Sequence, residues 1–351
     1  MLRLIDPITD HRWDDFIVKH AEGTIFHSSA WARVLRERYG DVYKYYILES
    51  VMGEILGAVP FFHLRNALIG NRLICLPSAD SCFPLVNNKN DYNELLAGAV
   101  NEVNQNMAST VEIRGWRGLG LPEECAIHRG PLYEFVHVVD LKRDLETLRT
   151  SMKRNGRYNL RVAERQSFTL KLGQDEKDLR TLHKMLLDAL KKHHALPPAY
   201  SFFQSIFRHL IIPGNGLMFF AELRGKIIAG NLYLCFKDTA LCKYSAQINS
   251  YFEYRPNYFL HWKAIEHFNK KSFRSYDFGG TNPNDQTLLF FKRNWGGEEN
   301  TQSFYYYPAE IDSRPVLLIK PLHLVYSTLE KSMPNLARGS LSCVMNKLTL
   351  D

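Results

Sequence analysis

The sequence lacks several features that would define a specialised class of protein. No window approaches the roughly 18 consecutive apolar residues of a membrane-spanning helix, and Asp6 and Pro7 interrupt the start of the chain before a signal-peptide core could form. We therefore expect a cytoplasmic protein. The six cysteines include no C-x-x-C pair and the chain has no H-E-x-x-H motif. These absences predict reduced thiols and no bound metal.

The composition that remains is typical of a globular protein. The chain has 351 residues, of which 45% are hydrophobic and 23% charged. Because single hydrophobic cores stop growing at roughly 250–300 residues, this length predicts two domains. We place them at residues 1–145 and 146–310, followed by a helical tail at 311–351. Basic residues along the tail favour either packing on the second domain or peripheral contact with a membrane surface.

Strand-like and helix-like patterns alternate through most of the chain, which predicts an α/β (α+β) fold with mixed sheets. Two stretches are alike. Residues 45–58 and 219–230 each read as strand, glycine-containing turn and strand, and Gly53 and Gly225 occupy the same place in the shared pattern G-[EK]-I-[IL]-[AG]-[GA]. The two copies are about one domain length apart, so we predict a duplication.

Similar elements are predicted around each copy. In the first half we expect helices at 29–38 and 91–105 and strands at 111–115 and 132–141. In the second half we expect helices at 176–192, 201–210 and 257–269 and strands at 239–245 and 274–278.

Positive charge is concentrated in one segment. The whole chain carries a net charge of +7, and residues 151–172 contribute six basic side chains against one acidic side chain. A basic residue recurs every four positions at Lys153, Arg157, Arg161 and Arg165, with Arg154 beside them. On a helix these side chains share one face, which is either a solvated surface or a binding face for a phosphate-bearing partner.

A second region combines a strand end with a short helix. Residues 276–280 read Y-D-F-G-G and are followed by a Gly, Asn and Pro loop, and residues 290–296 read F-F-K-R-N-W-G. Strand ends are favoured ligand positions. A lysine on the following helix, Lys292, can direct an ammonium into a cleft to stabilise an oxyanion or a phosphate, although a solvated lysine has the same periodicity. Asp277 reads either as a base or as a structural hydrogen-bond acceptor.

Four motifs occur together in this sequence. They are Y-D-F-G-G with F-K-R-N-W-G, the run K-R-N-G-R-Y-N-L-R-x-A at 153–163, the run F-H-S-S-A-W-A-R-V-L at 26–35, and the duplicated hairpin. Over roughly residues 1–310 this order resembles the FemABX-like and related GNAT-fold acyltransferases. The resemblance implies two tandem GNAT-like domains, the second carrying most of the site. It also implies that Lys292, preceded by Phe291, stabilises charge at the transferring carbonyl.

The same resemblance implies a function. It suggests transfer of an acyl or aminoacyl group, to nitrogen or oxygen, on a cell-envelope precursor such as peptidoglycan or on a polysaccharide precursor. The donor would be acyl-CoA or aminoacyl-tRNA, used as a substrate, with no permanently bound cofactor. The pyrophosphate loop Q/R-x-x-G-x-G/A of acetyl-CoA enzymes has no match, which argues against ordinary acetyl-CoA chemistry. The alternative is a non-catalytic module that holds tRNA or another polyanion; no motif indicates DNA.

The expected site has three groups of residues. The candidate catalytic residues are Lys292 and Asp277. The candidate substrate-binding residues are Phe291, Tyr244, Asn257, Tyr258, Arg33 and Arg36, the two arginines flanking Leu35, where relatives that bind nucleotide-linked muropeptides have a lysine. The candidate donor-binding or phosphate-binding residues are Lys153, Arg154, Arg157 and Arg161. Aromatic residues on strands and an Asn at a helix start also have ordinary structural roles in a core and at a cap.

Overall fold

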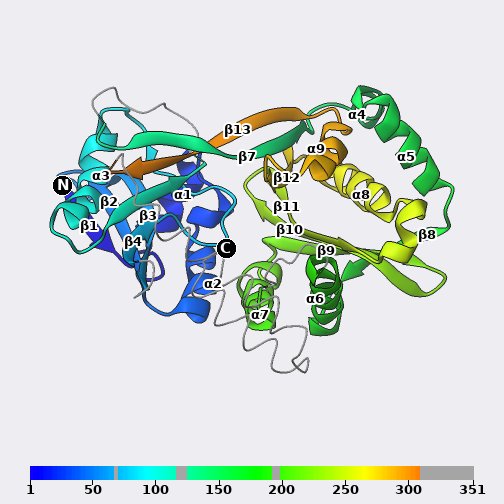
Figure 1. The fold of residues 1–351 in the computed structure, drawn as a ribbon, viewed down its shortest axis with the longest axis horizontal. Helices are drawn as coiled ribbons and strands as arrows, with labels where there is room; N and C mark the ends of the chain where they lie inside the picture. Colours follow the sequence, from blue (N-terminus) through cyan, green and yellow to red (C-terminus); the bar gives the residue numbers. More distant parts are fainter. Residues whose placement is uncertain (67–69, 116–124, 192–197, 309–351) are drawn as a thin grey trace. The chain divides into compact units, whose positions relative to one another are not determined.

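The computed structural model describes residues 1–66, 70–115, 125–191 and 198–308, and it divides into two compact units (Figure 1). Unit 1 comprises Met1–Tyr133 together with the described residues from Gln302 onward, and unit 2 comprises Glu134–Thr301. The strands β7 (His128–Asp140) and β13 (Glu298–Tyr307) each have residues in both units. The domain limits at 145 and 310 stay predictions, and the predicted tail lies outside the described residues.

Unit 1 is a mixed sheet with helices. Its strands follow the order β1 (Leu2–Ile5), β2 (Tyr43–Glu49), β3 (Ile55–Asn66), β4 (Gly70–Ile74), β6 (Thr110–Arg114) and β13, and β5 (Leu85–Val86) pairs with β3. Its helices are α1 (Arg12–Lys19), α2 (Ser29–Tyr39) and α3 (Asp91–Asn104), with a 3₁₀ turn at Ile25–His27. The parallel pairing of β4 with β6 across α3 makes this sheet mixed.

Helix α2 shows why the sequence forms these elements. The Ser28 side chain accepts a hydrogen bond from the Trp31 amide and so caps the first turn. Gly40 ends the helix with φ of 81°, a conformation that costs glycine little. Between these ends Trp31 and Leu35 are completely buried. The predicted helix at 29–38 is therefore confirmed.

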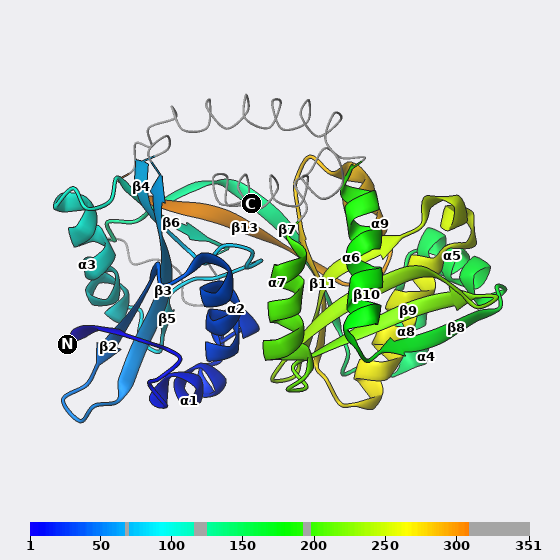
Figure 2. The same cartoon turned by 90° about the horizontal axis from the view of Figure 1, so that it is seen from below.

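Unit 2 has the same kind of architecture. Its strands follow the order β7, β12 (Ser275–Thr281), β11 (Thr239–Gln247), β10 (Lys226–Phe236), β9 (Gly216–Leu223) and β8 (Phe168–Gly173). Its helices are α4 (Leu145–Ser151), α5 (Arg154–Glu164), α6 (Glu176–Lys191), α7 (Tyr200–Ile206), α8 (Pro256–Lys270) and α9 (Gln286–Arg293). A π-helical turn at Phe207–Ile211 continues α7, and a 3₁₀ helix at Asn249–Tyr254 precedes α8. Helices α5 and α8 cover one face of the sheet, and α6 and α7 cover the other (Figures 1 and 2).

The duplicated hairpin is confirmed. Strands β2 and β3 form one antiparallel pair, and β9 and β10 form the other. Gly53 and Gly225 lie in the two turns with φ of 82° and 76°, so the shared glycine meets the same backbone requirement in both copies. Each pair also has a register shift beside its turn, at Leu48/Glu49 and at Ile227/Ala229.

The core of unit 2 is strongly aromatic. Phe219, Tyr233, Phe268 and Tyr276 are each at most 1% exposed and pack between the sheet and α8. Burying each large side chain contributes roughly 1.5–3 kcal/mol. This core fixes α8 and β12, which carry much of the candidate site. Among the described residues, every helix is too short or too polar to cross a lipid bilayer.

Candidate active site

Strands β11 and β12 diverge after a short parallel ladder. The paired residues are Thr239 with Ser275, Ala240 with Tyr276, and Leu241 with Asp277. Beyond Leu241 and Asp277 this ladder ends, although both strands continue. Diverging carboxyl ends of parallel strands leave backbone polar groups and space for a ligand, so this end of unit 2 is the natural place for a site.

Lys292 lies at this end of β12. Helix α9 begins where the Asp285 side chain accepts a hydrogen bond from the Leu288 amide. Lys292 is only 5% exposed, and its Nζ donates to the carbonyl oxygens of Gly279 at 2.7 Å and Gly280 at 3.0 Å. An ammonium is thus held in a largely water-excluded place by two carbonyl groups.

The backbone at Gly279 makes this arrangement possible. Gly279 has φ of 75°, and the register of β12 against β7 shifts between Asp277 and Gly280. The shift is a β-bulge, which frees carbonyl groups from the ladder. Asp277 is 8% exposed, and its Oδ1 accepts a hydrogen bond from the Gly279 amide at 2.8 Å. The structure therefore brings Asp277 and Lys292 to the same bulge.

Aromatic rings join α8 to α9 beside Lys292. The Phe291 ring lies 5.0 Å from that of Tyr258 and 5.5 Å from that of His261, and Tyr258 stacks on Trp295 at 5.3 Å. His261 Nδ1 is 2.6 Å from the Tyr276 hydroxyl oxygen. Burial, and then the charge of Lys292, lower the pKa of His261 to about 3. This ring is therefore neutral at pH 7.

Three buried polar atoms on these elements have no hydrogen-bond partner within the described part of the chain. They are Asn257 Oδ1 in the first turn of α8, Thr281 Oγ1 at the end of β12, and Trp295 Nε1 beside Tyr258. A buried polar atom without a partner costs free energy that a ligand can recover. Asn257 and Tyr258 thus both belong to this end of unit 2, as does Tyr244, which lies on the diverging part of β11 with its ring 4.8 Å from Phe203 of α7.

Arg33 and Arg36 lie on α2 of unit 1. Arg33 is exposed, and within that unit its Nη2 is 3.5 Å from the Ile8 carbonyl oxygen. Arg36 forms ion pairs with Asp6 at 2.8 Å and Asp41 at 2.6 Å. Both arginines belong to unit 1, whereas the group around Lys292 belongs to unit 2, so their predicted role in substrate binding stays a prediction.

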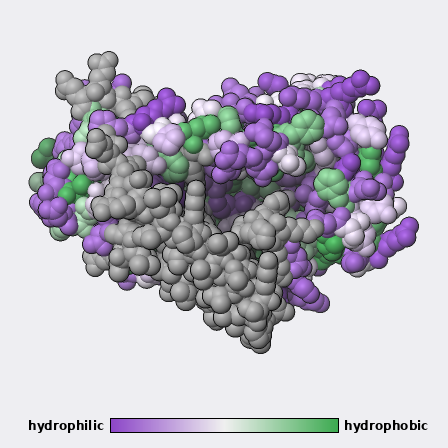
Figure 3. Space-filling model, in the orientation of Figure 1, coloured by the Kyte–Doolittle hydropathy of each residue, from purple (hydrophilic) through white to green (hydrophobic). Residues whose placement is uncertain are grey.

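The basic segment forms α5, and its exposed face differs in detail from the predicted one. Arg154, Arg161 and Arg165 are exposed, and Tyr158, which is 59% exposed, stands between them at helical spacing. Arg157 instead turns toward α4, where its Nη1 donates to the carbonyl oxygens of Thr150, at 2.9 Å, and Met152. Hydrophilic side chains predominate at this edge of unit 2 in Figure 3.

Helix α5 is attached to both helices of the candidate site. The amide of Lys153, an exposed residue at the start of α5, donates to the Asn294 carbonyl oxygen at 3.0 Å, just after α9. Arg255 Nε donates to Asn159 Oδ1 at 2.8 Å, just before α8. A Cβ added to Gly156 would lie 2.4 Å from the Asn294 carbonyl oxygen, so this glycine allows the close approach. The basic face and Lys292 are therefore parts of one rigidly packed group.

Sequence reasoning missed two buried polar residues of β7. Glu134 is 8% exposed and His137 is 2% exposed. His137 Nε2 lies 2.7 Å from Glu299 Oε2, and burial lowers the pKa of His137 below its usual value. Both residues interrupt the apolar pattern of the predicted strand at 132–141, and that interruption is the signal that could have singled them out.

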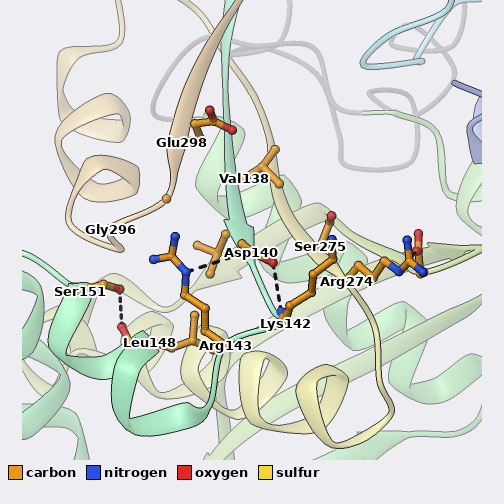
Figure 4. Close-up of a pocket in the computed structure, with 13 residues that line it drawn as sticks. Val138, Asp140, Lys142, Arg143, Leu148, Ser151, Arg274, Ser275, Gly296 and Glu298 are labelled. Atoms are coloured by element: carbon orange, nitrogen blue, oxygen red, sulfur yellow. Dashed lines mark hydrogen bonds and ion pairs between the residues drawn. The ribbon is translucent and has the colours of Figure 1, made fainter. Parts of the chain in front are cut away.

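A cavity of about 580 Å³ lies near the other end of β12 (Figure 4). Its lining includes Ser275, and four of its charged side chains form the ion pairs Arg143 with Asp140 at 3.8 Å and Arg274 with Asp238 at 3.0 Å. It includes neither Lys292 nor Asp277, so we do not place the reaction there. The described residues contain no group of three or more side chains suited to hold a metal ion.

Comparison with known proteins supports the fold. Residues 150–293 match the family model described as an acetyltransferase (GNAT) domain. The crystal structure of FemX is similar with a TM-score of 0.71, covering 91% of this chain and 99% of that chain at 15% identity. L-PGS from Bacillus licheniformis has a TM-score of 0.54, covering 94% and 99% at 11% identity. A tandem GNAT protein from the clavulanic acid biosynthesis pathway has a TM-score of 0.51, covering 89% and 100% at 11% identity. No curated protein matches the chain.

These findings define the class of protein. Residues 150–293 match an acetyltransferase (GNAT) domain, and the protein is an enzyme of the acyltransferase class. The chain has a FemABX-like GNAT fold with the tandem arrangement that the sequence predicted. GNAT acetyltransferases use acyl-CoA as a substrate and not as a permanently bound cofactor, so the acyl donor is here a substrate.

Proposed function

We propose that the protein transfers an acyl or aminoacyl group to an amine or hydroxyl of a cell-envelope or polysaccharide precursor, and that Lys292 stabilises the negative charge developing on the transferring carbonyl oxygen. The observation that carries this proposal is the buried ammonium held by the carbonyl groups of Gly279 and Gly280, where β11 and β12 diverge. A fixed charge in a water-excluded site stabilises an oxyanion far more than the same charge in water.

The surrounding residues have positioning roles in this proposal. Asp277 accepts a hydrogen bond from the Gly279 amide and so maintains the bulge whose carbonyl groups position the Lys292 ammonium. Asn257 Oδ1 accepts a hydrogen bond from a substrate N–H or O–H. Tyr244, whose ring lies against Phe203 of α7, contacts the substrate, and Tyr258 of α8 orients α9 through its contacts with Phe291 and Trp295. Phe291 acts indirectly, through the ring contacts that orient α9. Holding two reactants at attack distance supplies much of the rate of an acyl transfer.

The donor in this proposal is acyl-CoA or aminoacyl-tRNA, bound through its phosphates by the exposed basic face of α5. Lys153, Arg154 and Arg161 provide that charge, whereas Arg157 is engaged with the end of α4. A peptidoglycan or polysaccharide precursor as acceptor would place the enzyme in the cytoplasm at the inner face of the membrane, and contact through residues 311–351 belongs to the same proposal. The fold shared with FemX supports it.

A second function is favoured by the α5 face alone. Three exposed arginines with an exposed tyrosine between them suit a nucleic acid backbone and base, and would hold tRNA or another polyanion without turnover. This second function predicts a steep fall of affinity with salt and no product from any donor.

The test is product formation by the whole chain. Purified protein is incubated with acetyl-CoA or with a mixture of aminoacyl-tRNAs, together with extracted peptidoglycan and polysaccharide precursors, and the acceptors are analysed by mass spectrometry. We expect one acceptor to gain the mass of the acyl group from one donor. Tight, salt-sensitive tRNA binding with no product would support the second function instead.

A further inference from the structure

Glu134 is a carboxylate held against the glycine that supports Lys292. A Cβ added to Gly280 would lie 1.8 Å from Glu134 Oε2 and 2.6 Å from Oε1, so the carboxylate occupies the space that any other side chain would need. The carbonyl oxygen of the same Gly280 accepts the hydrogen bond from Lys292 Nζ at 3.0 Å. One glycine thus contacts a buried carboxylate and a buried ammonium.

The strand register explains how Glu134 arrives there. Gly280 pairs with Val136, and Asp277 pairs with Val138. Directly opposed residues project to the same face of a sheet, and residues two apart on a strand share a face. Glu134 therefore lies on the same face as Asp277, one step beyond Val136 and toward the carboxyl end of β12.

The separation of the two charges can be bounded. Standard bond lengths from Oε2 through the Gly280 backbone, together with the 3.0 Å hydrogen bond, put Glu134 Oε2 and Lys292 Nζ at most about 9 Å apart. The two charged groups are therefore close enough to act on one reacting carbonyl and its nucleophile.

We propose that Glu134 is the catalytic base that takes the proton from the attacking amine or hydroxyl, an assignment that rests on the proposed acyl transfer. The nucleophile forms a bond to the acyl carbon while Lys292 stabilises the oxyanion. The bond from that carbon to the sulfur or oxygen of the donor then breaks. The proton moves from the nucleophile to Glu134 and from Glu134 to the leaving group, so Glu134 returns to its ionised form at the end of the reaction.

The other ionisable groups on these strands and on α9 have contacts of their own. Asp277, on the same face, accepts the Gly279 amide and maintains the bulge. His137 lies on the opposite face of β7 and pairs with Glu299 of β13. Lys292 is a cation that contacts Gly280, the glycine against which Glu134 also lies. A positioned proton acceptor typically contributes 10²–10⁴-fold to a rate.

The test compares Glu134→Gln with wild type and with Glu266→Gln, which removes a carboxylate of α8 that pairs with Lys263 at 2.8 Å. Single-turnover consumption of acetyl-CoA and of aminoacyl-tRNA, with the extracted peptidoglycan and polysaccharide precursors as acceptors, is followed against pH, and the fold is checked by circular dichroism. We expect Glu134→Gln to lose about 100-fold or more in rate and to lose the fall in rate toward acid pH. Glu266→Gln should keep both, and Lys292→Met should be slow but keep that fall.

Gly280→Ala gives a supporting arm, because its methyl displaces the carboxylate without removing it, although the same glycine also holds Lys292. We expect it to lose at least about 10-fold in rate. Glu134→Gln with the rate and pH profile of wild type would overturn this assignment alone. A wild-type chain that consumes neither donor would overturn the proposed acyl transfer and the assignment together.

Discussion

At the residue scale, the candidate site depends on a backbone conformation and a buried cation that require each other. The positive φ of Gly279 turns two carbonyl groups out of the ladder, and Lys292 supplies the hydrogen-bond donors that those buried carbonyls need. Neither feature is stable alone, because an unpaired buried ammonium and unpaired carbonyls are both costly.

Gly279→Ala tests this dependence. An L-residue in the left-handed region costs about 1–2 kcal/mol, so we expect a loss of stability of that size in urea unfolding and a clear loss of turnover. Gly225→Ala is the matched control, because Gly225 has φ of 76° and no atom within 4 Å of an added Cβ. It should cost the same stability and leave turnover unchanged. Equal turnover in the two variants would show that the bulge has no role in the reaction.

His261 predicts how stability depends on pH. Its pKa is lowered from 6.5 to about 3 in the folded state, so the unfolded chain binds a proton that the folded chain does not between these values. The stability it contributes is complete above about pH 6.5 and falls as pH drops toward 3, by on the order of 4–5 kcal/mol. Urea unfolding at pH 7, 5 and 4 should therefore show a shallower loss for His261→Gln than for wild type, and parallel losses would contradict the burial argument.

The proximity of site residues could be predicted from the sequence only where the residues belong to one motif. Lys292, Phe291 and Asp277 lie in one short segment, so their proximity could be read from the chain. Glu134 could not be found this way, because only the pairing of Gly280 with Val136 brings it to the bulge. Arg36 could not be assigned either, since its ion pairs with Asp6 and Asp41 come from the packing of unit 1.

At the element scale, α5 combines a structural and an exposed surface. Arg157 donates to carbonyl groups at the carboxyl end of α4, whereas Arg154 and Arg161 remain exposed. Spacing of four residues predicted a shared face, but the hydrogen bonds of Arg157 to the end of α4 remove this side chain from that face.

These two surfaces respond differently to substitution. Reversing Arg154 and Arg161 to Glu should leave thermal stability unchanged within about 0.5 kcal/mol and weaken tRNA binding, and the salt slope should fall by about one unit for each phosphate that is no longer bound. Arg157→Met should instead destabilise the chain by about 0.5–1.5 kcal/mol, because the carbonyls of Thr150 and Met152 lose their donor. Fluorescence anisotropy with labelled tRNA and thermal melting separate the two effects. The α5 face would have no role in binding if the double reversal kept wild-type affinity.

Elements with strong periodicity were predicted well, whereas the short helix α4 and the edge strand β8 were missed. The helices at 91–105, 176–192 and 257–269 correspond to α3, α6 and α8. Helix α4 spans only seven residues, too few to show a helical period, and β8 is an edge strand whose Leu170 and Leu172 are 37% and 46% exposed.

At the scale of the whole molecule, the two units have the same kind of architecture, and the candidate site belongs to the second. Both units contain a hairpin with a positive-φ glycine and a mixed sheet, yet the buried cation, the bulge and the basic helix all belong to unit 2. The hairpin repeat indicated this organisation from the sequence, because a glycine-containing turn leaves a pattern that survives divergence of the flanking strands.

The most direct test of the account is the rate of acyl transfer by Lys292→Met. With the extracted precursors as acceptors, single-turnover consumption of acetyl-CoA and of aminoacyl-tRNA is measured for wild type, for Lys292→Met and for Lys263→Met, a control that removes a surface ion pair on α8. The account predicts that wild type and Lys263→Met consume one of the two donors at the same rate, and that Lys292→Met is at least about 100-fold slower with its fold intact. A Lys292→Met variant as fast as wild type would contradict it.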